Sequence, residues 1–202
     1  MHYRFHIVEK TVCHQGFFRL DRYRLQHDLF AGGTSPVITR ELLERGRAAA
    51  VLPYDPVRDS VVMIEQFRIG AIRSEHGAWL LEFVAGIIED GEKPEDVVRR
   101  EALEEAGCEL GELVPVARYL PSPGGSTEEL YLYCGRVDAG GAGGIHGLDE
   151  EAEDIRVHVY SFDKAMDLLE RGRIDSAAPI IALQWLALHR ERLRRRWLAA
   201  GG

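Results

Sequence analysis

The organisation of this chain follows from one stretch, Gly86-Ile-Ile-Glu-Asp-Gly-Glu92-Lys-Pro-Glu-Asp-Val-Val-Arg-Arg100-Glu101-Ala-Leu-Glu104-Glu105-Ala-Gly107-Cys108. It predicts a loop followed by a helix. Pro94 has a fixed φ that suits the first helical position, two acidic residues follow in the first turn, and Gly107 is placed to end the helix. The N-cap is poor, because Lys93 lacks a short polar side chain that could accept a backbone N–H.

Three carboxylates gather along this helix. At about 100° per residue, Glu101 and Glu105 stack in one row, Glu104 adjoins them, and an apolar row lies alongside. One interpretation is a solvated acidic helix held by ion pairs such as Arg100 with Glu104, each worth about 0.2–0.5 kcal/mol. The other is a metal site, because like charges at these spacings repel unless a cation lies among them, and carboxylate oxygens suit Mg²⁺ or Mn²⁺.

The stretch resembles the signature of the Nudix hydrolases at every fixed position. Five residues separate Gly86 from Glu92, and seven more lead to the run that begins at Arg100. The resemblance implies an α/β fold, a Nudix α/β/α sandwich with a mixed sheet. It also implies hydrolysis of a nucleoside diphosphate linked to another moiety, with divalent metal held by the helix.

Length and composition are those of an ordinary globular protein. The 202 residues suffice for one core and a small appended domain, and 46% are hydrophobic and 29% charged. The net charge of −8 argues against a nucleic-acid partner. The three cysteines suggest neither a disulfide framework nor a zinc site. No apolar run reaches the ~20 residues of a membrane span, and no signal-peptide core is present, so we expect a cytoplasmic protein without membrane contact.

Two domains are expected: an N-terminal antiparallel β domain over residues 1–47 and a Nudix domain over 48–202. The first is too small to be stable alone and should pack on its own main domain or on a partner chain. We expect residues 140–144, which are rich in glycine, to form a mobile loop, and the Arg-rich end of the last helix to complement its C-terminus. Strands are expected at 5–30 with a turn near 14–16, and at 37–42, 48–53, 61–67, 113–120, 129–137 and 155–160; helices are expected at 163–171 and 177–196.

Further segments resemble the ADP-ribose pyrophosphatase branch of the family. They are Ile64-Glu-Gln-Phe-Arg68, Ser122-Pro123-Gly124-Gly125 with the branch's usual proline, and the region from Gly144 to Val159. The branch implies two to three Mg²⁺ ions, with Mn²⁺ as a substitute. The implied ligands are the Ala85 carbonyl, Glu101, Glu105 and Glu153, with Glu104 in support, and Glu151 falls at the position of the catalytic base.

The same resemblance implies the substrate-binding residues and a homodimer that exchanges its N-terminal domains. Matching positions in the main domain are Arg68, Ile87, Ser122, Pro123, Gly124 and Glu128. Those in the N-terminal domain are Phe17, Phe18, Arg40 and Glu41. Each allows a simpler interpretation: the aromatic pair could be core residues rather than an adenine-stacking surface, and Arg40 with Glu41 could be a surface ion pair.

The expected activity is Mg²⁺-dependent hydrolysis of ADP-ribose to AMP and ribose 5-phosphate. Two alternatives remain at this point. Another nucleoside diphosphate sugar would need the same metal chemistry and a different pocket, and a ligand sensor with this fold would not turn over its ligand. A structural calcium site is disfavoured, because no EF-hand loop is present.

Overall fold

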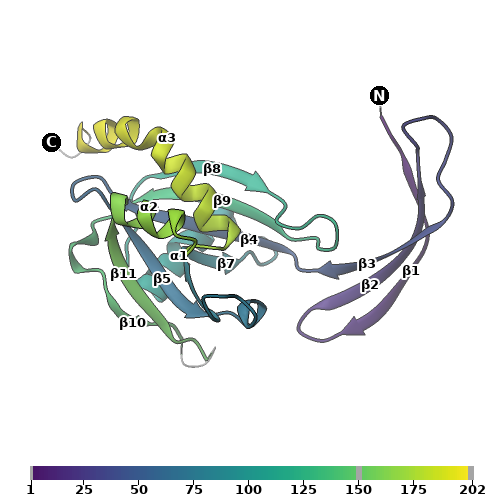
Figure 1. Ribbon diagram of the computed structural model, residues 1–202, viewed down its shortest axis with the longest axis horizontal. Coiled ribbons are helices and arrows are strands. Elements are labelled where there is room, and N and C mark those ends of the chain that lie inside the picture. The colour runs from purple at the N-terminus through teal and green to yellow at the C-terminus, as the bar shows by residue number, and fades with distance from the viewer. Residues whose placement is uncertain (1, 149–151, 200–202) are drawn as a thin grey trace. The chain divides into compact units, whose positions relative to one another are not determined.

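The computed structural model describes residues 2–148 and 152–199 (Figure 1). Its backbone contacts divide the chain into two compact units. The first runs to Arg47 and includes Leu120–Glu129, and the second contains the rest of the chain. The inclusion of Leu120–Glu129 in the first unit was not expected from the sequence.

The first unit is built on a three-stranded antiparallel sheet. Its strands are β1 (Phe5–Gln15), β2 (Arg19–His27) and β3 (Ile38–Glu44), in the order β1-β2-β3. All residues of β1 are exposed, and the buried side chains among the described residues of this unit are Asp21 and Ser35. The sheet therefore has no apolar core of its own, and a sheet of this size without one is unstable in isolation.

The second unit is an α/β/α sandwich with a mixed sheet, which confirms the expected fold class. The sheet runs in the order β10-β11-β5-β4-β9-β8, with β6 paired to β5 and β7 paired to β4. Its strands are β4 (Arg47–Asp55), β5 (Ser60–Phe67), β6 (Trp79–Glu82), β7 (Val84–Ile87), β8 (Leu113–Tyr119), β9 (Glu129–Arg136), β10 (Gly144–His146) and β11 (Ile155–Ser161). The helices are α1 (Pro94–Ala106), α2 (Phe162–Glu170) and α3 (Ala177–Ala199), and two 3₁₀ turns are η1 (Ile69–Ala71) and η2 (Ala139–Gly141).

Helices cover both faces of the sheet, with α2 and α3 on one side and α1 on the other (Figure 1). The alternation along the central strands explains this arrangement. In β5, Val61 and Met63 pack with α2 and α3, whereas Val62 and Ile64 pack with α1. The middle of β5, from Val61 to Ile64, is apolar at every position because both of its faces are buried.

Helix α1 begins and ends where its sequence predicts. Lys93 occupies the N-cap without a side-chain hydrogen bond, and Pro94 is the first helical residue. Gly107 ends the helix at φ 60°, in the left-handed region that glycine tolerates best. The Gly107 N–H donates to the Leu103 carbonyl at 3.0 Å, which is the hydrogen bond of the αL C-cap motif, and the Cys108 N–H donates to the Ala102 carbonyl at 2.9 Å.

The basic end of α3 binds acceptors on the fold instead of only complementing the helix terminus. Arg190 Nε donates to Asp59 Oδ1 at 2.8 Å, and Arg194 Nε donates to the Pro56 carbonyl at 3.1 Å. Arg196 pairs with Glu112. These contacts fasten α3 to the β4–β5 turn and to the segment before β8. Among the described helices, none is long and apolar enough to cross a membrane.

The expected mobile loop at residues 140–144 is wrong, since the stretch is largely structured. It contributes to η2 and begins β10, which pairs with β11. Asp138 caps η2 by accepting from the Gly140 N–H at 2.9 Å, and Asp55 accepts from the Ala139 N–H at 3.0 Å. Glycine content alone predicted flexibility because the hydrogen bond to Asp55 and the pairing of β10 with β11 join residues that are distant in the sequence.

Candidate active site

The predicted loop and helix meet where β7 approaches α1. A Cβ placed on Gly86 would lie 2.1 Å from Glu101 Oε1 and 2.4 Å from its Cδ. Real Cβ atoms do not come this close to other heavy atoms, so the glycine allows the Glu101 carboxylate to lie directly against the strand backbone. The first glycine of the signature is therefore needed for close approach of the two elements.

Glu105 is the most deeply buried carboxylate of the helix, with 3% of its surface exposed. Its Oε2 accepts a hydrogen bond from the Ala85 N–H at 3.1 Å. Burial raises the pKa of Glu105 to about 8; the Ala85 hydrogen bond opposes this rise, and the charges of Glu101 and Glu153 add to it. Glu105 thus lies beside Ala85, and both belong to the predicted metal ligands.

The Arg100 guanidinium forms ion pairs with both Glu101 and Glu104. Arg100 Nη1 lies 2.7 Å from Glu101 and 3.4 Å from Glu104, and Arg100 Nη2 lies 3.6 Å from Glu92. Burial raises the pKa of Glu101, whereas the Arg100 charge lowers it. The carboxylates are therefore less isolated than their spacing suggested. Arg100, on the helix, pairs with Glu92 of the signature loop, and Glu92 also accepts from the Glu89 N–H of that loop at 2.9 Å. Arg100 therefore links the loop to the helix.

Glu153 approaches this cluster from the segment between β10 and β11. Its negative charge contributes to the raised pKa values of both Glu101 and Glu105. The Glu153 carboxylate accepts from the Leu148 N–H at 3.2 Å, and Gly147, at φ 105°, leaves room for its Cβ. Glu151, the predicted base, lies outside the described residues.

The donor set fits a divalent cation, although the side chains are not gathered around a point. Within residues 2–148 and 152–199, no three His, Cys, Asp or Glu side chains are grouped closely enough to enclose an ion. The donors are nevertheless hard carboxylate oxygens, and the raised pKa values of Glu101 and Glu105 record burial and repulsion that a cation would relieve.

Arg68 lies at the edge of the cluster, since its charge acts against the raised pKa of Glu105. Arg68 Nε donates to Glu82 Oε2 at 2.7 Å, and the Gln66 amide approaches the same oxygen at 3.5 Å. Glu82 was not among the site residues expected from the sequence. The feature of the sequence that could have indicated Glu82 is that it is the one carboxylate within the apolar run from Trp79 to Ala85.

Phe17 and Phe18 line an open hollow of the first unit. His14, Leu20 and Leu43 complete its lining. The two phenyl rings meet edge to face with centroids 4.7 Å apart, and the Arg45 guanidinium lies 4.5 Å from the Phe18 centroid. Phe17 is 86% exposed, so it is not a core aromatic within this unit.

Arg40 and Glu41 point to opposite faces of the same sheet. They are consecutive in β3, opposite Tyr23 and Arg22 of β2, and successive strand residues alternate between faces. Leu43 lies two residues after Glu41, so the hollow with Phe18 is on the Glu41 face. Of the four substrate positions predicted in this unit, the sheet therefore places Arg40 on the face opposite the hollow.

The turn at Ser122–Gly125 is attached to β3. The Gly125 carbonyl accepts from the Leu43 N–H at 2.9 Å, and the Thr127 N–H donates to the Leu43 carbonyl at 3.0 Å. Glu128 pairs with Arg45 at 3.4 Å. These contacts bring Glu128 and the turn with Pro123 and Gly124 to the strand that carries Arg40 and Glu41. Ile87 lies separately, half exposed at the end of β7.

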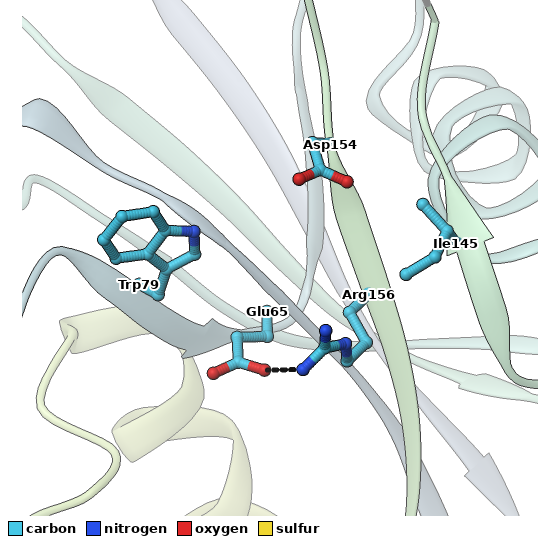
Figure 2. A pocket seen from close by; sticks show the side chains of 5 residues that line it. All are labelled: Glu65, Trp79, Ile145, Asp154 and Arg156. Carbon is cyan, nitrogen blue, oxygen red and sulfur yellow. Dashed lines mark ion pairs between the residues drawn. The ribbon is translucent and has the colours of Figure 1, made fainter.

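A second cavity, of about 190 Å³, lies on the other side of the main sheet and is not part of the carboxylate cluster. Figure 2 shows its lining, with Glu65 and Arg156 paired at 3.9 Å and Trp79 beside them. Glu65 follows Ile64 in β5, and Ile64 packs toward α1. The side chain of Glu65 therefore points to the face that carries α2 and α3.

The model of the NUDIX domain family matches residues 44–184, about two thirds of the chain. The chain belongs to the NUDIX family. An ADP-ribose pyrophosphatase of Escherichia coli (strain K12) is 53% identical over 191 residues, which cover 95% of this chain and 91% of that protein. A GDP-mannose pyrophosphatase of Klebsiella pneumoniae is 32% identical over 190 residues, with 90% of each chain covered.

A solved structure supports the same fold at lower identity. The crystal structure of an ADP compounds hydrolase superposes with a TM-score of 0.69 at 20% identity, covering 98% of this Nudix chain and 96% of that one. At this identity the similarity concerns the fold. Both comparisons include the first unit, and the predicted family resemblance is confirmed.

Proposed function

We propose that this Nudix hydrolase cleaves the pyrophosphate linkage of ADP-ribose and releases AMP and ribose 5-phosphate. The observation that carries the proposal is the 53% identity to an ADP-ribose pyrophosphatase over nearly the whole of both chains. The 32% identity to a GDP-mannose pyrophosphatase makes that sugar nucleotide the second candidate. A non-catalytic sensor is disfavoured, because Glu101, Glu104, Glu105, Glu151 and Glu153 are all retained.

In this proposal the metal ions bind beside the C-terminal half of α1, which carries Glu101, Glu104 and Glu105. Ala85, Glu101, Glu105 and Glu153 would hold two to three Mg²⁺ ions, or Mn²⁺ in their place, with Glu104 in support. Bound cations would supply charge neutralisation of the pyrophosphate and a polarised water. Glu105 requires loss of its proton to act as a ligand, and the Ala85 N–H stabilises the resulting carboxylate.

The chain's own side chains would bind and orient the substrate. Arg68 would hold phosphate, because its planar fork matches phosphate oxygens. The hollow at Phe17 and Phe18 would receive the adenine, since base stacking on an aromatic side chain contributes about 1–3 kcal/mol. Glu151 would accept the proton of the attacking water. The remaining substrate contacts are assigned to Arg40, Glu41, Ile87, Ser122, Pro123, Gly124 and Glu128.

We also propose a homodimer in which residues 1–47 complete the active site of the partner. The support is a sheet without an apolar core and a first strand whose side chains are all exposed, including Phe5 at 72% and Val12 at 53%. The interface should exceed about 2,000 Å², as obligate dimers do. No nucleic acid or membrane partner is proposed. Three free cysteines suit a reducing compartment such as the cytoplasm.

A turnover screen tests the substrate assignment. Purified protein with Mg²⁺, and in parallel with Mn²⁺, would be given ADP-ribose, GDP-mannose and other nucleoside diphosphate sugars. We expect ADP-ribose to have the highest kcat/KM, with AMP as the nucleotide product. A higher kcat/KM for GDP-mannose would replace the assignment, and saturable binding without product would favour the sensor.

A further inference from the structure

Glu82 holds Arg68 through a short and partly buried ion pair. Arg68 Nε lies 2.7 Å from Glu82 Oε2, and the two side chains are 44% and 16% exposed. We propose that Glu82 is a positioning residue that keeps the Arg68 guanidinium beside the carboxylate cluster of α1 and turned toward the substrate phosphate. The inference rests on the proposed function, because Arg68 is assigned to phosphate there.

The pairing of β6 with β5 places Glu82 on the face of the sheet that carries α1 and its carboxylates. Glu82 lies opposite Ile64 in the pairing of β6 with β5, and Ile64 packs toward α1. Paired residues on neighbouring strands share a face. Gln66 is buried and lies within 3.5 Å of the same Glu82 oxygen, so this carboxylate is approached from two sides.

The contact also selects which nitrogens of Arg68 face the substrate. A guanidinium has five N–H donors in a rigid plane, and Glu82 accepts from Nε. Binding at Nε fixes the plane and leaves the two terminal nitrogens as a fork for phosphate oxygens. The backbone of Arg68 is fixed as well, because its N–H donates to the Ala78 carbonyl at 2.7 Å.

Two acidic groups compete for this arginine. The charge of Arg68 already opposes the raised pKa of Glu105, which places it within electrostatic reach of a predicted metal ligand. Arg100 is an example of an arginine that pairs directly with one of the predicted metal ligands, since it lies 2.7 Å from Glu101. Without Glu82, Arg68 would turn to Glu105 and compete there with a divalent cation.

Glu65 provides a matched control for Glu82. It lies on β5, the strand paired with β6, and its carboxylate contacts His158 at 2.9 Å and Arg156 at 3.9 Å. Glu65 follows Ile64 in β5, so its side chain points to the face of the sheet opposite Glu82. Replacing Glu65 removes the same charge from the same sheet without touching Arg68.

The experiment compares Glu82→Gln and Glu82→Met with Glu65→Gln and Glu65→Met. Steady-state kinetics on ADP-ribose, calorimetric titration of Mn²⁺ without substrate, and thermal unfolding would be measured for each. We expect Glu82→Met to raise KM roughly tenfold with a smaller change in kcat, as loss of uniform binding does. It should also weaken Mn²⁺ binding. Glu82→Gln should be milder because its amide oxygen still accepts from Arg68, and the Glu65 variants should resemble the wild type.

A double variant separates positioning from a structural role. Glu82→Met added to Arg68→Met should not raise KM further, and the double variant should recover the Mn²⁺ affinity that Glu82→Met alone loses. An equal rise in KM in both backgrounds, or unchanged Mn²⁺ affinity in Glu82→Met, would overturn the proposal. If the wild type does not hydrolyse ADP-ribose, the proposed function fails, and the Mn²⁺ titrations still decide the role of Glu82.

Discussion

Glu105 is a carboxylate in surroundings that disfavour its ionisation. Its pKa in the folded chain is about 8, above its ordinary value of 4.5, so between these pH values the folded chain holds a proton that the unfolded chain has lost. That contribution to stability is complete below about pH 4.5 and is lost as pH rises through about 8. If Glu105 is a metal ligand as proposed, metal binding would require loss of the same proton, so metal affinity should rise with pH over this range.

Glu105→Gln tests this linkage. With chelator present, the free energy of unfolding of the wild type should fall between about pH 5 and pH 8, by at most about 5 kcal/mol. The variant should show a flatter pH dependence and weaker Mg²⁺ binding with lower turnover. Urea unfolding at several pH values, with calorimetry of Mg²⁺, makes the comparison. Parallel pH profiles for the two proteins would show that Glu105 is not the group responsible.

Glu151 and Glu153 are expected to differ in role although they are two residues apart. Glu151→Gln is nearly isosteric and should lower kcat by about 10²–10⁴-fold while metal and substrate binding persist, because a general base contributes that factor. Glu153→Gln should instead weaken Mg²⁺ binding, like Glu105→Gln. Kinetics with calorimetry of Mg²⁺ and a non-hydrolysable substrate analogue would separate the two. A wild-type kcat for Glu151→Gln would place the base elsewhere.

At the scale of elements, the proposed metal site would depend on the close contact between β7 and α1. Gly86→Ala would place a Cβ into the Glu101 carboxylate, whose flexible end can move away. We expect a modest loss of stability, about 1–3 kcal/mol as for other overpacking changes, and a larger loss of metal affinity. Gly141→Ala is the control, since a Cβ there meets no atom within 4 Å. Unfolding and Mg²⁺ titrations would be compared, and equal metal affinity in both variants would count against a ligand role for Glu101.

At the scale of the whole molecule, charge is unevenly divided along the chain. Residues 1–47 contain eight Lys or Arg and five Asp or Glu, a net charge of +3. Because the whole chain has a net charge of −8, the remaining residues carry −11. Opposite net charges favour association of this segment with a Nudix domain. In the proposed homodimer, the exposed apolar side chains of β1 would be buried against the partner.

A mixing experiment tests whether two chains build each active site. Arg40→Ala and Glu105→Gln impair different halves of the proposed site, so each pure dimer should be weakly active. In a randomly mixed population, half of the dimers combine the variants and one of their two sites is intact, giving roughly a quarter of wild-type activity if the N-terminal segment is exchanged. No recovery after unfolding and joint refolding, or a monomer in analytical ultracentrifugation, would contradict the exchanged dimer.

The sequence alone determined the limits of α1, the row of carboxylates and the family, because these depend on local rules. Proline at the first turn, glycine at the end and the period of the helix act within a few residues. The two-sided burial of β5 could also be anticipated from its apolar run. The expectation of a mobile glycine-rich segment failed because Asp55, which binds the Ala139 N–H, and β11, which pairs with β10, are distant in the sequence.

Only the tertiary structure decided which side chains meet and how strongly their ionisation is disfavoured. Glu82 contacts Arg68 because β6 pairs with β5. Arg190 contacts Asp59 because α3 packs on the same face of the sheet as α2, next to the β4–β5 turn. The faces of Arg40 and Glu41 follow from the register of β3 against β2. The pKa of Glu105 depends on burial, which is a property of the packed core and cannot be read from a helical spacing.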